Sequence, residues 1–283
     1  MLHRALVSAL LAGVWLFSAG TAFCGELVWC RFDGPPMNIP SGPLKDEGYS
    51  DQFVHDLFGV MEGFEHREVV CTVARTLKLI AETPDVCNGS LVYSPERDRF
   101  VHYSKRAVAY VPNRLLVLKK NKKRLAPYMV DGSVDLRKLL MARKLTIGFV
   151  RGRAYGDYVD KPLADAGRSG NIRWLTTLTA GVRSFLAGRL DLLVAYPNEV
   201  VYFGRLEDVG VGFTSVPIQG EKMVDIYVGC SDSPTGRKAI AQINELLENG
   251  YRGVYLKYYL EWLDESSQEA VLRHVSGWKG VGF

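Results

Sequence analysis

The stretch SPERDRFVHYS, residues 94–104, crowds acidic and basic side chains around aromatic rings in a chain that is 47% hydrophobic. Arg97 is its most specific candidate for chemistry, because a guanidinium stays charged and presents a planar fork that matches a carboxylate through two parallel hydrogen bonds. The alternative is a solvated surface helix on which Arg97 binds nothing. The fold around the stretch decides between the two interpretations.

Other polar residues follow predicted strands, at points where α/β sheets bind ligands. Such ligands lie outside the carboxyl ends of the strands, where backbone amides and helix N-termini point outward. The candidates are Asp33, Met37, Arg75, Gly89 and Ser90 in the first half of the chain, and Arg151 to Tyr155 and Tyr196 to Glu199 in the second. Arg75 opens a predicted helix, where a cation opposes the macrodipole. This unfavourable placement suits a ligand contact, and an exposed surface arginine is the alternative.

The N-terminus has the pattern of a secretory signal peptide: a basic start, an apolar run at 5–17 and small residues at 18–22. A membrane anchor would need about twenty continuous apolar residues. We therefore expect residues 1–22 to be removed and the mature protein to be exported to the periplasm. A lipid anchor at Cys24 is the alternative, disfavoured because Phe23 stands where lipoprotein processing requires a small side chain.

Four further cysteines form an even set inside the mature chain: Cys30, Cys71, Cys87 and Cys230. In an oxidising compartment they permit three pairings, and four buried free thiols are the alternative. The chain contains no CxxC motif and no close pair of histidines, so the spacing of a zinc site is missing. We expect neither a metal nor another cofactor.

The net charge of +4 is mild, and KKNKKR, residues 119–124, is the one basic run. Nucleic acid is disfavoured as a partner, because an exported protein rarely meets it and no aromatic side chains interleave the lysines. A solvated turn after a strand is the prediction for this run.

Strand-like and helix-like segments alternate along the chain, which predicts two α/β units with parallel sheets. The first unit is predicted to contain strands at 26–30, 65–73 and 85–93 and helices at 49–61 and 74–82. The second is predicted to contain strands at 145–150, 171–175 and 190–196 and helices at 152–166 and 178–189. A later strand at 225–230 and helices at 236–250 and 251–263 are assigned to the first unit, whose sheet lacks a cover on one face.

This pattern predicts two lobes joined by two hinge segments. Lobe 1 is expected to be discontinuous and to comprise residues 25–111 and 224–283, and lobe 2 is expected to comprise residues 113–222. The hinges are expected near 111–114 and 220–224.

Seven stretches resemble, in order and spacing, the extracellular solute-binding proteins of the polar amino acid type. These stretches are DGPPM, GYSDQFVHDL, SPERDRFVHYS, LLVLKK, LTIGFVRGRAYG, GRLDLLVAYPNEVVYF and LENGYRGVYLKYYLEWL. Each is weak alone, but together they cover the mature chain, and EHR, SPER and YPNE resemble a divergent branch. The resemblance implies an α/β, two-lobed type II periplasmic binding protein fold, in which each lobe is a mostly parallel sheet flanked by helices.

In the resembling family, a Ser/Thr-x-x-Arg tetrad follows the third strand, and its arginine grips the ligand's carboxylate in the cleft between the lobes. The matching residues here are Ser94 to Arg97. The resemblance thus implies that Arg97 binds the ligand, whereas Glu96, Asp98 and Arg99 are assigned to solvent.

The chain departs from the family where an aspartate holds the ligand's ammonium group, because an ungapped alignment puts Tyr196 there. A phenol cannot supply that charge. Either Glu199 takes over, or the ligand is not an α-amino acid. Tyr93, Tyr155 and Tyr196 give the cleft an aromatic character in one interpretation and are packed residues in the other.

The resemblance implies capture of a small carboxylate-bearing, amino acid-like solute for the permease of an ABC transporter, with closure of the lobes around it. A sensory role, signalling to a membrane receptor, is the first alternative. An enzyme on the same fold is the second, although the sequence contains no plausible catalytic set. We expect a monomer with a small-molecule ligand and no nucleic acid partner.

The implied fold also suggests how the cysteines pair. Cys30 and Cys71 lie on the first two strands, which are neighbours in a parallel sheet with a right-handed crossover. In this fold the strand that returns from the second lobe lies beside the third strand, so Cys230 is expected to bond to Cys87.

Overall fold

The computed structural model describes residues 25–167, 169–210 and 212–282. The predicted signal peptide and Cys24 lie outside the described residues. Within those ranges, no helix has the length and apolar character needed to cross a membrane.

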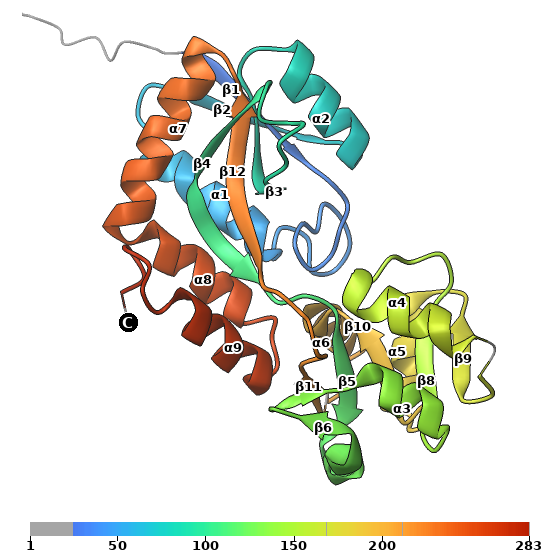
Figure 1. The fold of residues 1–283 in the computed structure, drawn as a ribbon. Coiled ribbons are helices and arrows are strands. Elements are labelled where there is room, and N and C mark those ends of the chain that lie inside the picture. Colours follow the sequence, from blue (N-terminus) through green and yellow to red (C-terminus); the bar gives the residue numbers. More distant parts are fainter. Residues whose placement is uncertain (1–24, 168, 211, 283) are drawn as a thin grey trace, which may run out of the picture.

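The elements fall into two groups, each built on its own sheet (Figure 1). The elements of lobe 1 are β1 (Glu26–Arg31), α1 (Tyr49–Val60), β2 (Glu65–Val70), α2 (Val73–Glu82), β3 (Val86–Val92), β4 (Val101–Tyr110), β12 (Val224–Ser231), α7 (Pro234–Leu246), η2 (Leu247–Tyr251), α8 (Arg252–Leu260) and α9 (Glu265–Val275). The elements of lobe 2 are β5 (Arg114–Leu118), η1 (Lys119–Tyr128), β6 (Met129–Val130), β7 (Ser133–Val134), α3 (Leu136–Ala142), β8 (Ile147–Val150), α4 (Asp157–Ala166), β9 (Ile172–Leu175), α5 (Leu178–Leu186), β10 (Leu192–Ala195), α6 (Pro197–Leu206) and β11 (Phe213–Val216).

The chain leaves the first sheet after β4 and returns to it with β12, so lobe 1 is discontinuous. The sheet of lobe 1 has the strand order β2-β1-β3-β12-β4, and that of lobe 2 has the order β11-β5-β10-β8-β9. The predicted two-lobed α/β fold is confirmed. We call the connecting segments 111–113 and 217–223 the two crossings.

One strand in each sheet runs antiparallel to the other four, namely β12 in lobe 1 and β5 in lobe 2. β1 pairs in parallel with β2 and β3, and β8 pairs in parallel with β9 and β10. β12 runs antiparallel to β3 and β4, and β5 runs antiparallel to β10 and β11. Since Tyr110 of β4 pairs with Val224 of β12, the chain leaves and re-enters lobe 1 at the same end of its sheet.

Helices cover both faces of the lobe 1 sheet. On one face, α1 packs against α8, with the ring of Phe53 stacked on that of Tyr255 at a centroid distance of 4.1 Å. On the other face, α2 covers a smaller cluster that includes Cys30, Ile80 and Leu91. The helices predicted at 236–250 and 251–263 therefore supply the missing cover, since α7 and α8 both pack on β4.

The structure decides one alternative of the sequence analysis and corrects one of its predictions. SPERDRFVHYS is not a helix, because residues 95–100 form a turn and β4 begins at Val101, paired along β12. The basic run at 119–124 is part of the 3₁₀ helix η1 instead of a turn. The basic run remains largely exposed, and the buried residues of η1, Leu125 and Tyr128, come after it.

One of the two predicted disulfides is present. Cys87 and Cys230 are bonded across the paired strands β3 and β12, which confirms that prediction. The predicted bond between Cys30 and Cys71 is wrong, since both are buried free thiols with Sγ atoms 3.5 Å apart. Cys30 pairs in register with Val69, so Cys71 meets it diagonally. Burial raises the pKa of Cys30 to about 12, which keeps this thiol protonated.

We expect the Cys87–Cys230 disulfide to contribute strongly to stability, because it joins residues 143 apart in sequence. Chain entropy predicts that replacing both cysteines by alanine lowers the free energy of unfolding by up to about 5 kcal/mol, measured by urea denaturation. Adding a reductant to this double variant should change nothing further. A second loss of stability on reduction would contradict the free state of Cys30 and Cys71.

Candidate functional site

Arg97 lies in the turn that follows the carboxyl end of β3. Val92, the last residue of this strand, pairs with Ile226, two residues after β12 begins. The carboxyl ends of the parallel strands β1 and β3 therefore point toward the end of lobe 1 at which the chain crosses to lobe 2. This is the end of an α/β sheet at which ligands bind.

Arg97 is partly exposed, and no ion pair within the described ranges engages its guanidinium. Its Nη1 lies 3.5 Å from the Val92 carbonyl oxygen, at the limit of a hydrogen bond. The neighbouring carboxylate of Glu96 instead accepts a hydrogen bond from the Ser94 hydroxyl. Most of the donors of Arg97 thus remain available to an anion.

Three tyrosines lie beside this turn on the face of the sheet away from α1 and α8. The ring of Tyr93 is 5.3 Å from that of Tyr103 and 6.3 Å from that of Tyr227. Tyr93 is 46% exposed, so the cluster offers an aromatic surface next to Arg97.

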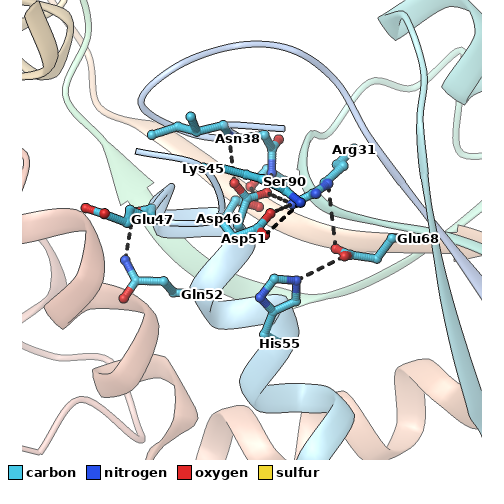
Figure 2. A network of polar contacts seen from close by, with 12 residues as sticks. Arg31, Asn38, Lys45, Asp46, Glu47, Asp51, Gln52, His55, Glu68 and Ser90 are labelled. Atoms are coloured by element: carbon cyan, nitrogen blue, oxygen red, sulfur yellow. Dashed lines mark hydrogen bonds and ion pairs between the residues drawn. The ribbon is translucent and has the colours of Figure 1, made fainter. Parts of the chain in front are cut away.

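The loop that carries Asp33 is held by a network of charged side chains around Asp51 (Figure 2). The Asp51 carboxylate accepts hydrogen bonds from the Asn38 side chain at 2.7 Å and the Ile39 backbone at 2.6 Å, and Arg31 lies 3.2 Å away. Burial raises the pKa of Asp51. Asp33 is exposed in this loop.

His55 and Glu68 extend the same network across α1 and β2 (Figure 2). His55 Nε2 lies 3.1 Å from Glu68 Oε2, and Arg31 Nε lies 3.8 Å from the other oxygen of Glu68. The hydrogen bond to Glu68 raises the pKa of His55, and the carboxylates of Asp46 and Asp51 add to this effect.

Gly89 and Ser90 face the helices α1 and α8. A side chain at Gly89 would meet a methyl group of Val54 at 2.5 Å, so only glycine permits this close approach of β3 to α1. The Ser90 hydroxyl donates to Ser50 Oγ at 2.9 Å and also bonds to Tyr255. Both predicted site residues therefore lie in the core of lobe 1, apart from the turn that holds Arg97.

Arg75 and Arg151 are exposed. Arg75 lies in the first turn of α2, where its backbone N–H donates to the Thr72 hydroxyl. The Arg151 guanidinium lies 5.8 Å from the ring centroid of Trp174. The structure does not bring either residue to the cluster described next.

Three predicted residues of lobe 2 meet around Arg153, which lies between two tyrosine rings. Its guanidinium carbon is 5.5 Å from the ring centroid of Tyr155 and 5.0 Å from that of Tyr196. Its Nη1 and Nη2 donate to the two Glu199 oxygens at 3.1 and 2.8 Å, and Nη2 also donates to Asn113 Oδ1 at 3.1 Å. Arg153 thus ties α6 and the segment before α4 to the first crossing.

Glu199 is committed to internal partners. Besides both terminal nitrogens of Arg153, it accepts a hydrogen bond from the Tyr196 backbone at 3.1 Å and so caps α6. Burial raises the pKa of Glu199, and the charge of Arg153 opposes that shift. Glu199 therefore cannot replace the missing aspartate as a receptor for an ammonium group without losing these partners.

The lobes touch where the N-terminus of α6 meets α1. Asn198 Nδ2 donates to the Tyr49 hydroxyl at 3.2 Å. The Tyr49 ring lies edge-on to Tyr110 and Tyr259, at 5.3 and 4.9 Å. The Tyr259 hydroxyl accepts a hydrogen bond from the Val111 backbone at 2.9 Å, so these rings reach the first crossing.

A second contact between the lobes lies at the other end of α6. The Arg205 guanidinium stacks 4.0 Å from the ring centroid of Trp262, and Ser215 N donates to Asp264 Oδ2 at 2.8 Å. The hydroxyls of Ser215 and Ser267 are 2.8 Å apart. The segment that joins α8 to α9 is therefore bound to lobe 2.

The sequence analysis did not assign roles to several residues that organise this region, namely Tyr49, Asn113, Arg153, Asn198 and Tyr259. Arg153 and Asn198 lie within segments selected by the carboxyl-end rule. The two tyrosines and Asn113 carried no sequence signal, since their roles depend on contacts between distant segments.

Comparison with solved structures identifies the fold. A polar amino acid ABC uptake transporter substrate-binding protein from Streptococcus thermophilus superposes with a TM-score of 0.61 at 15% identity, over 89% of this chain and 91% of that chain. The unliganded, open L-cystine solute receptor of Neisseria gonorrhoeae gives 0.60 at 13% identity, over 88% and 97%. This is the type II periplasmic binding protein fold. An ancestral cyclohexadienyl dehydratase, at 0.50 and 16% identity over 84% and 92%, shares it.

No protein-family model and no curated protein sequence matches the chain. At the identities above, the structural likeness establishes the type II periplasmic binding protein fold and leaves the ligand open.

We expect Arg153 to be a structural residue of lobe 2. Arg153→Ala leaves the largely buried Glu199 without its cation, which should lower the free energy of unfolding by about 2–4 kcal/mol in urea denaturation. Arg151→Ala is the matched control, because Arg151 is exposed, and it should change stability by less than about 0.5 kcal/mol. Equal effects of the two substitutions would contradict this role.

The His55–Glu68 pair should stabilise the protein at acidic pH. The pKa of His55 is raised in the folded state, so protonation of this side chain stabilises the fold. The added stability is fully present below the pKa of the unfolded state, roughly 6.5, and is lost as the pH rises through the pKa of the folded state. Because both side chains are partly exposed, the stability difference from His55→Gln should stay below about 1 kcal/mol.

Denaturation of both proteins at about pH 5.5 and about pH 8.5 measures this difference. A difference that grows with pH would contradict the assignment.

Proposed function

We propose that this protein binds a small carboxylate-bearing solute between its lobes, in the periplasm, and presents it to the permease of an ABC transporter. The observation that carries the proposal is Arg97, a partly exposed arginine whose guanidinium has no carboxylate partner among the described residues, at the carboxyl end of β3. A guanidinium with no internal carboxylate partner keeps its donors free, and a ligand carboxylate can engage them through charge-assisted hydrogen bonds.

The connection between the lobes supports a mechanism in which they close on the ligand. We propose the predicted hinges at 111–114 and 220–224, which overlap the two crossings, as the segments that move. Arg114 and Glu221 hold these crossings together, with Arg114 Nε donating to Glu221 Oε1 at 3.0 Å. A ligand that contacts Arg97 in lobe 1 and the N-terminus of α6 in lobe 2 would favour the closed arrangement.

The named neighbours favour transport over the other candidates. Two of them are solute-binding proteins for polar amino acids or L-cystine, which supports a small-molecule ligand and a membrane partner. A sensory role would use the same ligand site with a different membrane partner. The ancestral dehydratase supplies the competing enzymatic candidate.

Arg97→Ala tests the proposal. In a thermal-shift screen over amino acids, dicarboxylates and short peptides, an acid that stabilises the wild type should be identified by mass action. Its affinity should fall roughly hundredfold or more in Arg97→Ala, since two charged hydrogen bonds are lost, and the melting temperature of the unliganded protein should hardly change. Arg97→Lys should rescue poorly, because an ammonium lacks the fork.

Arg99→Ala is the matched control, because Arg99 is an exposed arginine in the same turn. It should retain wild-type affinity. Undiminished affinity in Arg97→Ala would end the proposal, and conversion of the bound acid into a product would favour the enzymatic candidate.

A further inference from the structure

The basic run KKNKKR at 119–124 has no part in the candidate ligand site. Five of its six residues are basic, and they form the first part of η1. The buried side chains of Leu125 and Tyr128 fix η1 to lobe 2. The exposed residues of the run are Lys119, Lys120, Lys122, Lys123 and Arg124. A folded element thus presents these cations to solvent.

The run lies at the end of the lobe 2 sheet opposite to the crossings. In Figure 1 it belongs to the green coil below the arrowhead of β5. β5 begins next to the first crossing and β11 ends next to the second, whereas η1 follows the far end of β5. Leu192 of β10 pairs with Val117 of β5 and with Ile147 of β8, so β8 and β10 begin at this far end. Arg153 follows the other end of β8.

Two further exposed cations join the run at this end, Lys144 just before β8 and Arg189 just before β10. Asp191 connects the three segments, since its carboxylate pairs with Arg124 and accepts a hydrogen bond from the Thr146 backbone at 2.8 Å. Six cations define what we call the basic end of lobe 2, namely Lys119, Lys120, Lys122, Lys123, Lys144 and Arg189.

The basic end is not neutralised from within the protein. Among the described residues, no carboxylate forms an ion pair with any of its six cations, and Asp191 is paired with Arg124 instead. The six positive charges exceed the net charge of +4 of the whole chain, so the remainder of the chain is slightly negative. Positive charge is therefore concentrated at one end of the molecule, where it attracts an extended anionic surface.

We propose that the basic end of lobe 2 binds the surface of an anionic lipid bilayer, with the crossings directed away from the lipid. Clusters of about four to eight Lys or Arg side chains bind anionic headgroups through the negative surface potential of a membrane.

The composition of the basic end favours lipid over other polyanions. Five of its six cations are lysines, whose compact ammonium groups on flexible stems suit a diffuse array of headgroups. An acidic protein partner is matched better by the arginine fork, and the cores of protein interfaces are depleted in lysine. No aromatic residue lies within 119–127, so a stacking platform for nucleic acid is missing from the run.

Co-sedimentation with lipid vesicles tests the proposal. The protein should bind phosphatidylcholine vesicles that contain about 30% phosphatidylglycerol at about 0.02 M salt, and it should not bind pure phosphatidylcholine. Binding should weaken at least about tenfold at about 0.5 M salt, because the attraction between exposed charges is screened.

Two triple variants with the same change in net charge locate the binding surface. Each basic residue near the lipid contributes about fivefold in affinity, so the combination of Lys120→Gln, Lys122→Gln and Lys123→Gln should weaken binding about hundredfold. The control combines Arg99→Gln, Lys238→Gln and Lys257→Gln, three exposed positions of lobe 1. It should retain the wild-type affinity to within about twofold.

Thermal melts establish that both variants are folded. Equal loss of binding in the two triple variants would assign the effect to net charge and overturn the proposal. So would a wild type that does not bind the anionic vesicles, or that binds both kinds of vesicle equally. Tighter binding to soluble polyglutamate than to vesicles of equal charge concentration would assign the basic end to an acidic protein partner. None of these outcomes involves Arg97, so the proposed function is tested separately.

Discussion

The ion pair between Arg114 and Glu221 fixes the geometry on which the two-lobed structure depends. Arg114 is 3% exposed at the start of β5, and Glu221 lies in the second crossing, so the pair joins the two connections between the sheets. Burial raises the pKa of Glu221 in spite of Arg114. Such a pair adds little net stability, because desolvation offsets the attraction, but removal of either partner leaves an uncompensated charge. The pair therefore specifies how the crossings lie against each other.

The residues next to Arg114 anchor the first crossing in both lobes. The Val111 backbone donates to Tyr259 of lobe 1, and Asn113 accepts from Arg153 of lobe 2. The α6 helix then bridges the lobes at both of its ends, through Asn198 and through Arg205. The end of α6 that carries Asn198 is thus connected through the helix to the contact with the segment before α9.

The internal pairing of charges explains which side chains are left for a ligand. Arg153 and Glu199 neutralise each other within lobe 2 and hold Tyr155 and Tyr196 in place. Arg97 has no such partner in the part of lobe 1 that the structure describes. An unpaired guanidinium can bind an anion without first giving up another partner. A group that is already in an internal ion pair must break that pair before it binds, which costs additional free energy.

The sequence by itself determined the α/β class and the discontinuous first lobe, because periodic burial and strand order are local and topological properties. The Cys87–Cys230 bond was implied by the resemblance to a known fold, and the structure contains it. It also identified Arg97, Tyr155, Tyr196 and Glu199 as candidates for the site. The contacts that each of them makes were decided only by the tertiary structure.

Glu199 was a candidate ligand group until Arg153, 46 residues away, was seen to occupy both of its oxygens. Gly89 and Ser90 were candidates until α1 and α8 were seen to cover them. Cys30 and Cys71 lie on neighbouring strands as expected, but a register offset leaves them as free thiols. In each case the deciding contact joins segments that are far apart in the chain. Hydrogen-bond partners and strand register depend on how such segments pack together, and a local sequence pattern does not encode that packing.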